Sequence, residues 1–166
     1  MLAVIIGFVI VVLDQAAKVA IRQTLVLGES YPVIEGYFNL NYLRNTGAVW
    51  GMFQAQNEWL ILLSLLVLTL IAVFYRWLVD QRGVHRLAMG FMLGGIIGNL
   101  IDRIKLGWVT DFLDFHWQAS HWPSFNIADS AICVGVVIYL ASSFWRPAPR
   151  SDTPDKTRQP NGIPSP

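Results

Sequence analysis

Four aspartates in this chain of 166 residues are candidates for acid–base chemistry. Asp14, Asp102 and Asp129 lie within or at the ends of long apolar stretches, and Asp111 lies in the connection between the last two stretches. A carboxylate at membrane depth is costly, so an acid there marks a functional site by default. If the stretches cross a membrane alternately, all four acids gather at one face of it, and we expect the site at that face.

Two of these acids have a cation nearby in the sequence. Lys18 lies four residues after Asp14, a spacing that puts both on one helical face, and Arg103 directly follows Asp102. An acid beside a fixed cation keeps a low pKa and stays ionised. We therefore expect Asp14 and Asp102 to have structural roles.

The other two acids, Asp111 and Asp129, have no basic residue three or four positions away. Two such carboxylates brought together in a partly dry site cannot both ionise, so the pair shares a proton. One acid then takes a proton from water while the other donates to a carbonyl oxygen. Such a pair hydrolyses an amide without a metal or a covalent intermediate. Their separation of eighteen residues does not impose this contact, so two unrelated solvated acids remain the alternative.

The residues next to Asp111 offer two competing interpretations. Asp114 points away from Asp111 if the segment between them is extended, but shares its face in a helical turn, and both conformations remain open. A metal site would use these two acids with His116 and His121, yet no HExxH or comparable ligand spacing is present. We interpret the histidines as interfacial residues and expect neither a metal nor a cofactor.

The composition is that of a membrane protein. Apolar residues make up 54% of the chain and charged residues 14%, whereas soluble domains carry about 25% charged residues. The net charge of +1 gives no electrostatic reason to expect nucleic-acid binding. The single cysteine, Cys133, excludes an intrachain disulfide and is interpreted as a small core residue.

Four apolar stretches are long enough to cross a membrane, which requires about 20 residues. They cover about residues 1–20, 58–76, 87–103 and 127–145. The sequence therefore predicts an all-α membrane protein with four transmembrane helices, in one domain over residues 1–146. Residues 147–166 are polar and rich in proline, and are predicted to be a disordered cytoplasmic tail.

Two further patterns concern packing and the loops. Gly90, Gly94 and Gly98 recur every four residues, which places them on one side of a helix where a neighbouring backbone can approach closely. Residues 38–42 alternate between apolar and polar, which is typical of a short strand. We expect a small strand-rich cap on the membrane surface over about residues 30–55.

Arginine and lysine residues in the connections predict the orientation. Arg76, Arg82 and Arg86 lie between the second and third stretches, and Arg146 and Arg150 follow the fourth, whereas the other two connections carry only Arg44 and Lys105. Both termini are therefore predicted to be cytoplasmic, with the cap and the acids on the outer side. The first stretch lacks a positive leader and a cleavage motif, so we expect it to be retained.

Five short motifs occur in order along the chain. They are DQAAK at 14–18, NTGA at 45–48, GNLIDR at 98–103, VTDF at 109–112 and FNIADS at 125–130. Together, over about residues 10–145, they closely resemble the lipoprotein signal peptidases, the type II signal peptidases of bacteria. The resemblance implies an aspartyl endopeptidase of the bacterial cytoplasmic (inner) membrane that cuts prolipoproteins just before the lipid-modified cysteine.

The resemblance also implies roles for individual residues. Asp111 and Asp129 match the catalytic dyad, and Asp102 matches a structural acid. The residues that would bind substrate or brace the site are Asp14, Lys18, Asn45, Gly47, Asn99, Arg103 and Asn126. The implied partners are a diacylglyceryl-modified prolipoprotein and membrane lipid, with the enzyme a monomer. The segment 117–124, rich in tryptophan and histidine, and the tail depart from the family pattern.

Two other classes of function are consistent with a small membrane protein of this kind. A proton-coupled transporter would use Asp14, Asp102 and Asp129 as a relay, but it needs a polar path to both membrane faces. The second and third stretches offer almost no acid or base in their inner halves, which argues against a relay. A non-catalytic membrane subunit would use its acids for packing and topology alone.

Overall fold

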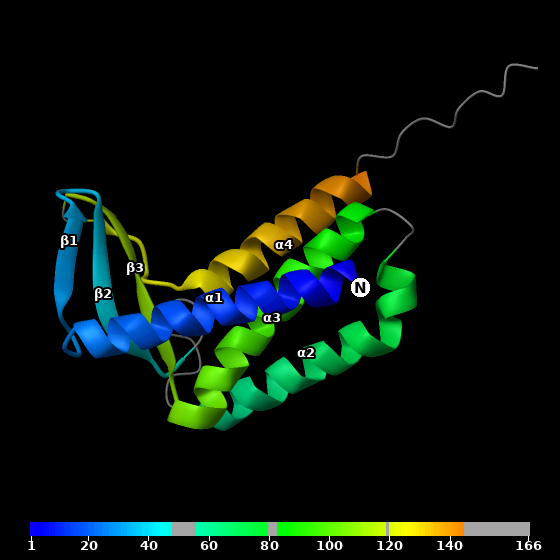
Figure 1. The fold of residues 1–166 in the computed structure, drawn as a ribbon, viewed down its shortest axis with the longest axis horizontal. Helices are drawn as coiled ribbons and strands as arrows, with labels where there is room; N and C mark the ends of the chain where they lie inside the picture. The colour runs from blue at the N-terminus through cyan, green and yellow to red at the C-terminus, as the bar shows by residue number, and fades with distance from the viewer. Residues whose placement is uncertain (48–55, 80–82, 119, 145–166) are drawn as a thin grey trace, which may run out of the picture.

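The computed structural model describes residues 1–47, 56–79, 83–118 and 120–144. Within them the elements are, in chain order, α1 (Leu2–Thr24), β1 (Ser30–Ile34), β2 (Phe38–Asn45), α2 (Asn57–Leu78), α3 (Gly83–Leu106), β3 (Val109–Trp117), β4 (Ser120–His121) and α4 (Ile127–Phe144). The helices form a bundle with the sheet at one end (Figure 1). The start of α1 and the end of α4 lie together at the other end.

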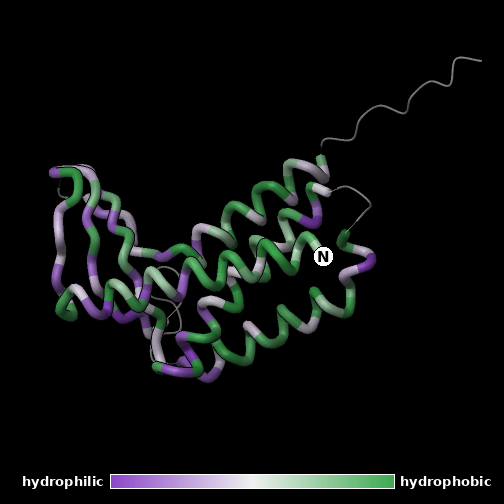
Figure 2. The backbone as a smooth tube through the Cα atoms, in the orientation of Figure 1, coloured by the Kyte–Doolittle hydropathy of each residue, from purple (hydrophilic) through white to green (hydrophobic). Residues whose placement is uncertain are grey.

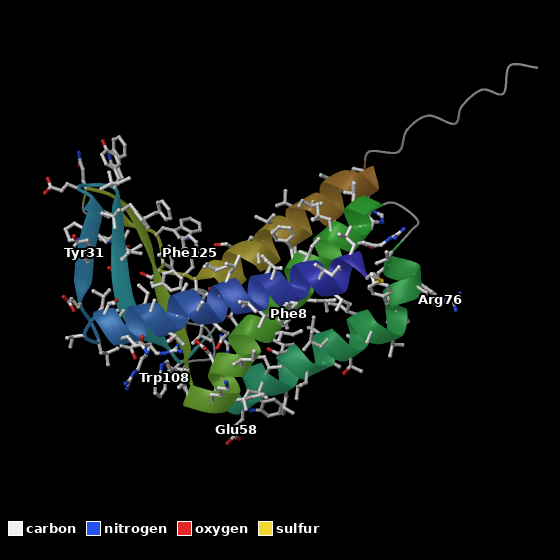
Figure 3. All side chains as sticks on the ribbon, viewed as in Figure 1. Phe8, Tyr31, Glu58, Arg76, Trp108 and Phe125 are labelled. Carbon is white, nitrogen blue, oxygen red and sulfur yellow. The ribbon has the colours of Figure 1, made fainter. Side chains whose placement is uncertain are left out.

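Each helix in the described part of the chain is long and apolar enough to cross a membrane. The helices are mostly apolar along their length, whereas polar residues concentrate in the sheet and near the helix ends (Figure 2). Large apolar side chains project outward from the bundle, as Phe8 of α1 does (Figure 3). Its side chain is 69% exposed, and that of Val73 on α2 is 68% exposed. Such a surface is suited to lipid rather than to water.

The predicted glycine seam joins α3 to α1. A Cβ atom on Gly94 would lie 2.8 Å from the carbonyl oxygen of Gly7, and one on Gly90 would lie 2.9 Å from that of Ala3. A Cβ atom on Gly98 would lie 2.7 Å from the carboxylate of Asp14. The seam therefore brings the α1 carboxylate directly against the backbone of α3.

A second glycine contact joins α3 to α4. A Cβ atom on Gly95 would collide with the carbonyl oxygen of Ala128, at the start of α4. The glycine seam and this contact together pack α3 against both α1 and α4. The acids on these three helices are consequently held at fixed distances from one another.

The expectation of an all-α protein is wrong, because the described residues also form a four-stranded antiparallel sheet in the order β1-β2-β3-β4. β2 pairs with β3 along most of its length, with Leu43 opposite Asp111 and Asn45 opposite Val109. β3 belongs to the connection between the third and fourth helices, whose conformation the sequence left open. It forms because it pairs with β2, which is distant in the sequence, so no local pattern reveals it.

The helices also differ from their predicted bounds. α1 continues to Thr24, and α3 begins at Gly83 and ends at Leu106. The first turn of α3 contains His85, a polar residue that is only 7% exposed. The prediction counted only apolar residues and therefore placed the start of this helix at residue 87, four residues too late. Residues 48–55 of the predicted cap and the tail at 147–166 lie outside the described residues.

Candidate active site

Asp111 lies on β3, on the strand face that also carries Val109. Its carboxylate accepts hydrogen bonds from two amide side chains: Asn45 Nδ2 donates to Oδ2 at 2.8 Å, and Asn126 Nδ2 donates to Oδ1 at 2.8 Å. Asn45 reaches it because β2 and β3 are paired, and Asn126 because it directly precedes α4. Asp111 is only 3% exposed.

Asp129 lies in the first turn of α4, where Asn126 caps the helix. Asn126 Oδ1 accepts the backbone N–H of Asp129 at 2.9 Å, and the Asp129 carboxylate accepts the backbone N–H of Asn126 at 3.3 Å. This is the reciprocal arrangement of a capping box, which fixes both side chains. Asn99 Nδ2 on α3 donates to Asp129 Oδ1 at 2.7 Å.

One side chain therefore connects the two acids. The amide of Asn126 is completely buried; its nitrogen bonds Asp111 and its oxygen bonds the backbone of Asp129. Both acids also line the same cavity. Asp111 of β3 and Asp129 of α4 are thus linked through Asn126 and line one cavity, while their joint catalytic role stays a prediction.

The environment of Asp111 favours its protonated form. Burial raises the pKa of the Asp111 carboxyl, and the nearby charge of Asp129 raises it further. The hydrogen bonds from Asn45 and Asn126 and the charge of Lys18 oppose this, and the resulting pKa is about 7. A carboxyl group with that pKa both gives and takes a proton near neutral pH.

A second cluster of acids lies behind the first and is neutralised by cations. Lys18 Nζ lies 2.8 Å from Asp14 Oδ2 and 3.5 Å from Asp102 Oδ2, and all three side chains are at most 1% exposed. This confirms the predicted contact between Asp14 and Lys18. The partner expected for Asp102 is wrong: among the described residues its ion pairs are with Lys18 and Arg22, not with Arg103. Successive residues on a helix point in different directions, which separates Arg103 from Asp102.

Asn99 links the two clusters. Its oxygen accepts a hydrogen bond from Lys18 Nζ at 2.9 Å, and its nitrogen donates to Asp129. Because the lysine can only donate, it fixes the orientation of the amide and directs the NH₂ group of Asn99 toward the carboxylate of Asp129. The structural cluster thereby orients a contact of the site.

Arg103 and Gly47 form part of the rim of the site. Arg103 Nη2 donates to the carbonyl oxygen of Gly47 at 3.0 Å, and the backbone N–H of Gly47 donates to Asn45 Oδ1 at 2.9 Å. This contact fixes the orientation of the Asn45 amide, so that its nitrogen faces Asp111. Each residue that the family resemblance singled out therefore lies in or next to one hydrogen-bonded network.

Three residues of the network were missed in the sequence. Arg22 Nη1 donates to Thr110 Oγ1 at 2.8 Å, and the backbone N–H of Thr110 donates to Asp102 Oδ2 at 3.0 Å. Gln15 Nε2 donates to Asp102 Oδ1 at 3.1 Å. Arg22 continues the face of Asp14 and Lys18 by one more turn, a spacing that would have identified it. Gln15 and Thr110 lie within the motifs DQAAK and VTDF, but no role was assigned to either.

The site opens into a cavity of about 810 Å³. Its polar end contains Asn45, Asn99, Arg103, Asp111 and Asp129. Its other walls are mostly apolar and come from the sheet, from the segment before α4 and from the helices, at Leu43, Ile96, Val109, Trp122, Pro123, Phe125, Ile132 and Cys133. A cavity with an apolar wall and a few convergent polar groups is the usual form of a ligand site.

Asp114 does not share the site. It lies three residues after Asp111 on an extended strand, so the two side chains point to opposite faces. Asp111 is therefore separated from Asp114, which contacts His121. No group of three or more histidine, cysteine or acidic residues in the described part of the chain could hold a metal ion.

Comparison with known proteins identifies relatives over nearly the whole chain. The family model described as Signal peptidase (SPase) II matches residues 6–145. A "Lipoprotein signal peptidase" of Geobacter sulfurreducens is 48% identical over 139 residues, which are 82% of this chain and 86% of that protein. One of Bacillus pumilus is 42% identical over 134 residues, 81% of this chain and 86% of that protein.

Two solved structures share the fold. A bacterial membrane enzyme determined at 2.3 Å resolution has a TM-score of 0.79 and 28% identity, covering 95% of this chain and 93% of that one. Another at 1.9 Å has a TM-score of 0.77 and 28% identity, covering 87% of this chain and 94% of that one. The bundle with a sheet at one end is thus the architecture of known membrane enzymes.

Proposed function

Because this chain belongs to the signal peptidase II family, whose members are aspartic-type proteases that remove signal peptides from prolipoproteins, we propose that Asp111 and Asp129 are its catalytic dyad. One observation supports this most strongly. Both acids line one cavity, their hydrogen-bond donors are asparagine side chains and backbone N–H groups, and one asparagine bridges them. Such a pair can share and transfer a proton, whereas Asp14 and Asp102 form ion pairs with Lys18 and do not line the cavity.

The reaction begins with a water molecule between the two carboxyl groups. One carboxylate takes a proton from the water, and the oxygen of the water attacks the carbonyl carbon of the substrate. The other carboxyl group donates its proton to the carbonyl oxygen of the substrate. When the tetrahedral intermediate collapses, the departing amine takes a proton from the protonated acid, and the other acid takes a proton from a hydroxyl of the intermediate, so the dyad again holds one proton. No bond between enzyme and substrate forms, and the proton belongs to the pair rather than to either acid.

The amide groups and the guanidinium around the dyad hold the reacting atoms in place. Asn45, Asn99 and Asn126 are each fixed at one end by another residue or by the helix cap, so they need no reorganisation during the reaction. Arg103 lines the cavity with its charge available to developing negative charge. Lys18 and Asp14 act behind them, as braces for Asn99 and for the start of α4, whose Ala128 N–H donates to Asp14 at 2.9 Å.

The cavity suits a substrate that is held in a membrane. Its polar end lies where the sheet meets α3 and α4, and its apolar walls include Ile96 and Ile132 from those helices. A prolipoprotein with its signal helix in lipid brings the bond before its diacylglyceryl-modified cysteine to this boundary. The bond is then cut without crossing the hydrocarbon core.

The proposed orientation puts the sheet on the outer side of the bacterial cytoplasmic membrane. Arg76, at the end of α2, lies far from the sheet, whereas Glu58, at its start, lies near the sheet end (Figure 3). Arg86 lies in the first turns of α3, at the same end as Arg76. Positive residues favour the cytoplasmic side, so the start of α1 and the end of α4, which lie at the end away from the sheet, face the cytoplasm. The domain acts as a monomer.

The proposal is tested by cleavage of a diacylglyceryl-modified precursor in detergent. We expect Asp111→Asn and Asp129→Asn each to lower the rate by at least about 10³-fold, because each removes a proton-transfer group. Glu58→Gln, an acid-to-amide change at an exposed helix start, is the matched control and should leave the rate unchanged. Full activity in both dyad variants would refute the proposal.

The same assay separates the alternatives. A chelator should leave cleavage unchanged, and inhibition that zinc reverses would support a metal site instead. Proton uptake into vesicles by the wild type, lost in Asp129→Asn but without any cleavage, would support a transporter. A labelled C-terminus found on the outer side would refute the proposed orientation.

A further inference from the structure

Asp114 is a buried acid that the proposed hydrolysis does not use. It is 3% exposed and lies on the face of β3 opposite to Asp111. Asn39 Nδ2 on β2 donates to its Oδ2 at 2.9 Å, and His121 Nδ1 lies 3.0 Å from its Oδ1 and 3.2 Å from its Oδ2. Burial raises the pKa of Asp114, but the hydrogen bonds from His121 and from Asn39 and Asn41 outweigh it and lower the pKa. Asp114 is therefore an ionised acceptor at neutral pH.

The histidine bound to this acid begins a segment that lines the substrate cavity. His121 ends β4, and the next four residues, 122–125, all line the cavity; we refer to them as the wall segment. Phe125, the last of them, lies between β3 and α4 (Figure 3). The position of His121 therefore decides where the wall segment starts.

Backbone hydrogen bonds attach both ends of the wall segment to β3, and the carbonyl oxygen of Phe125 accepts from Phe112 at 3.0 Å and from Leu113 at 2.8 Å. The backbone N–H of Trp122 donates to the carbonyl oxygen of Phe115 at 2.9 Å, and that of Phe125 donates to the carbonyl oxygen of Leu113 at 3.1 Å. Between these points Pro123 has no N–H to donate, and Ser124 is reached by Asn41 only at 3.5 Å. A side-chain contact just before Trp122 adds a fixed point at the start of the segment.

His121 is well placed to be that point. Its side chain is 52% exposed, so it contacts few residues that would hold it, yet its ring is fixed on two sides. Asp114 binds one ring nitrogen, and the ring of His116 stacks against it with centroids 4.7 Å apart and planes 13° apart. The buried carboxylate anchors an otherwise exposed ring.

We propose that Asp114 is a positioning residue, which acts through His121 to hold the wall segment where it contacts the precursor in the cavity. This inference rests on the proposed function. The dyad is not affected directly, because the partners of Asp111 are Asn45 and Asn126, on the other face of β3. Loss of the contact between Asp114 and His121 should therefore weaken substrate binding and leave the chemical step nearly unchanged.

The test is the steady-state kinetics of the full-length enzyme on a lipidated precursor peptide. Asp114→Asn and His121→Ala should each raise KM about tenfold, with kcat within about twofold of wild type. The double variant should be no worse than His121→Ala alone, because both changes break one interaction. His121→Gln, whose amide can still donate to Asp114, should restore most of the affinity. Glu35→Gln, an acid in the exposed turn between β1 and β2, is the matched control.

Two results would overturn the inference. The first is a KM unchanged in both single variants; the second is a kcat that falls together with the unfolding temperature, as for a merely structural role. Failure of the wild type to cleave would refute the proposed function instead. In that case alkylation of Cys133, which also lines the cavity, still tests the wall segment: it should be at least about threefold faster in both variants. Equal alkylation rates would overturn the inference.

Discussion

The protein buries two groups of acids side by side, and they differ in what surrounds them. Asp14 and Asp102 are bound to Lys18, within 3.5 Å, and their charge is balanced inside the protein. Asp111 and Asp129 receive hydrogen bonds from the side chains of asparagines, which are neutral. Amides stabilise a carboxylate less than a cation does, and burial together with the charge of Asp129 raises the pKa of Asp111 to about 7.

The two groups of acids therefore differ in role: the acids bound to Lys18 hold the helices together, whereas Asp111 and Asp129 are proposed to transfer protons. The charge-balanced group fixes α1 to α3 and orients Asn99. The amide-bound group is costly to bury, and on the proposed function this cost is tolerated because the group transfers a proton during catalysis. Asn99 accepts a hydrogen bond from Lys18 and donates one to Asp129, so the group around Lys18 helps to orient the group that contains Asp129.

Removing Lys18 from its ion pairs with Asp14 and Asp102 should have the largest effect on the free energy of unfolding. Lys18→Met leaves two buried carboxylates with only Arg22 to balance them, and we expect a loss of about 3–5 kcal/mol in the free energy of unfolding. Unfolding in detergent, followed by tryptophan fluorescence, measures it. Lys105→Met, at an exposed position in the last turn of α3, is the matched control. A loss below about 1 kcal/mol would show that the buried lysine is not needed to balance the acids.

The pH dependence of catalysis tests the reactive group. Since burial and Asp129 raise the pKa of Asp111 to about 7, the dyad loses its shared proton as the pH rises through that value. The ratio kcat/KM, which reports the free enzyme, should fall about tenfold per pH unit above about 7. The unfolding temperature measured over the same range serves as the control. A ratio that stays constant to pH 9 would contradict a shared proton.

The smallest effect expected is a gain in stability at the reactive group. Between about pH 4 and 7, Asp111 is protonated in the folded protein but ionised in the unfolded chain. The free energy of unfolding therefore falls as the pH rises from about 4 to 7. Asp111→Asn should therefore raise the free energy of unfolding by about 1–3 kcal/mol at pH 8 and hardly change it at pH 4. Equal effects at both values would contradict the raised pKa. Glu58→Gln again controls for the loss of an acid.

The sequence predicted those parts of the molecule that depend on local spacing. The four apolar stretches correspond to α1, α2, α3 and α4 in the described residues, and the four-residue spacings predicted the contact of Asp14 with Lys18 and the glycine seam. Each of these features follows from helical periodicity, which can be read within one segment. The choice of Asp111 and Asp129 also rested on local charge, namely on the absence of nearby cations in the sequence.

Features that depend on distant pairing could not be predicted in this way. β3 exists because it pairs with β2, and only that pairing brings Asn45 to Asp111. The link from Arg22 to Thr110 joins α1 to the same strand. The asparagines were recognised through family motifs, but their partners depend on how three helices and the sheet meet. Arg103 illustrates the limit, since adjacency in the chain suggested the wrong partner for Asp102.

The bridge made by Asn126 also has a consequence for the newly synthesised chain. Asp111 needs Asn45 from one side and Asn126 from the other, so the reactive centre assembles only after the last helix has joined the bundle. On the proposed function, a nascent chain that still lacks Asn126 and α4 therefore has an incomplete catalytic centre.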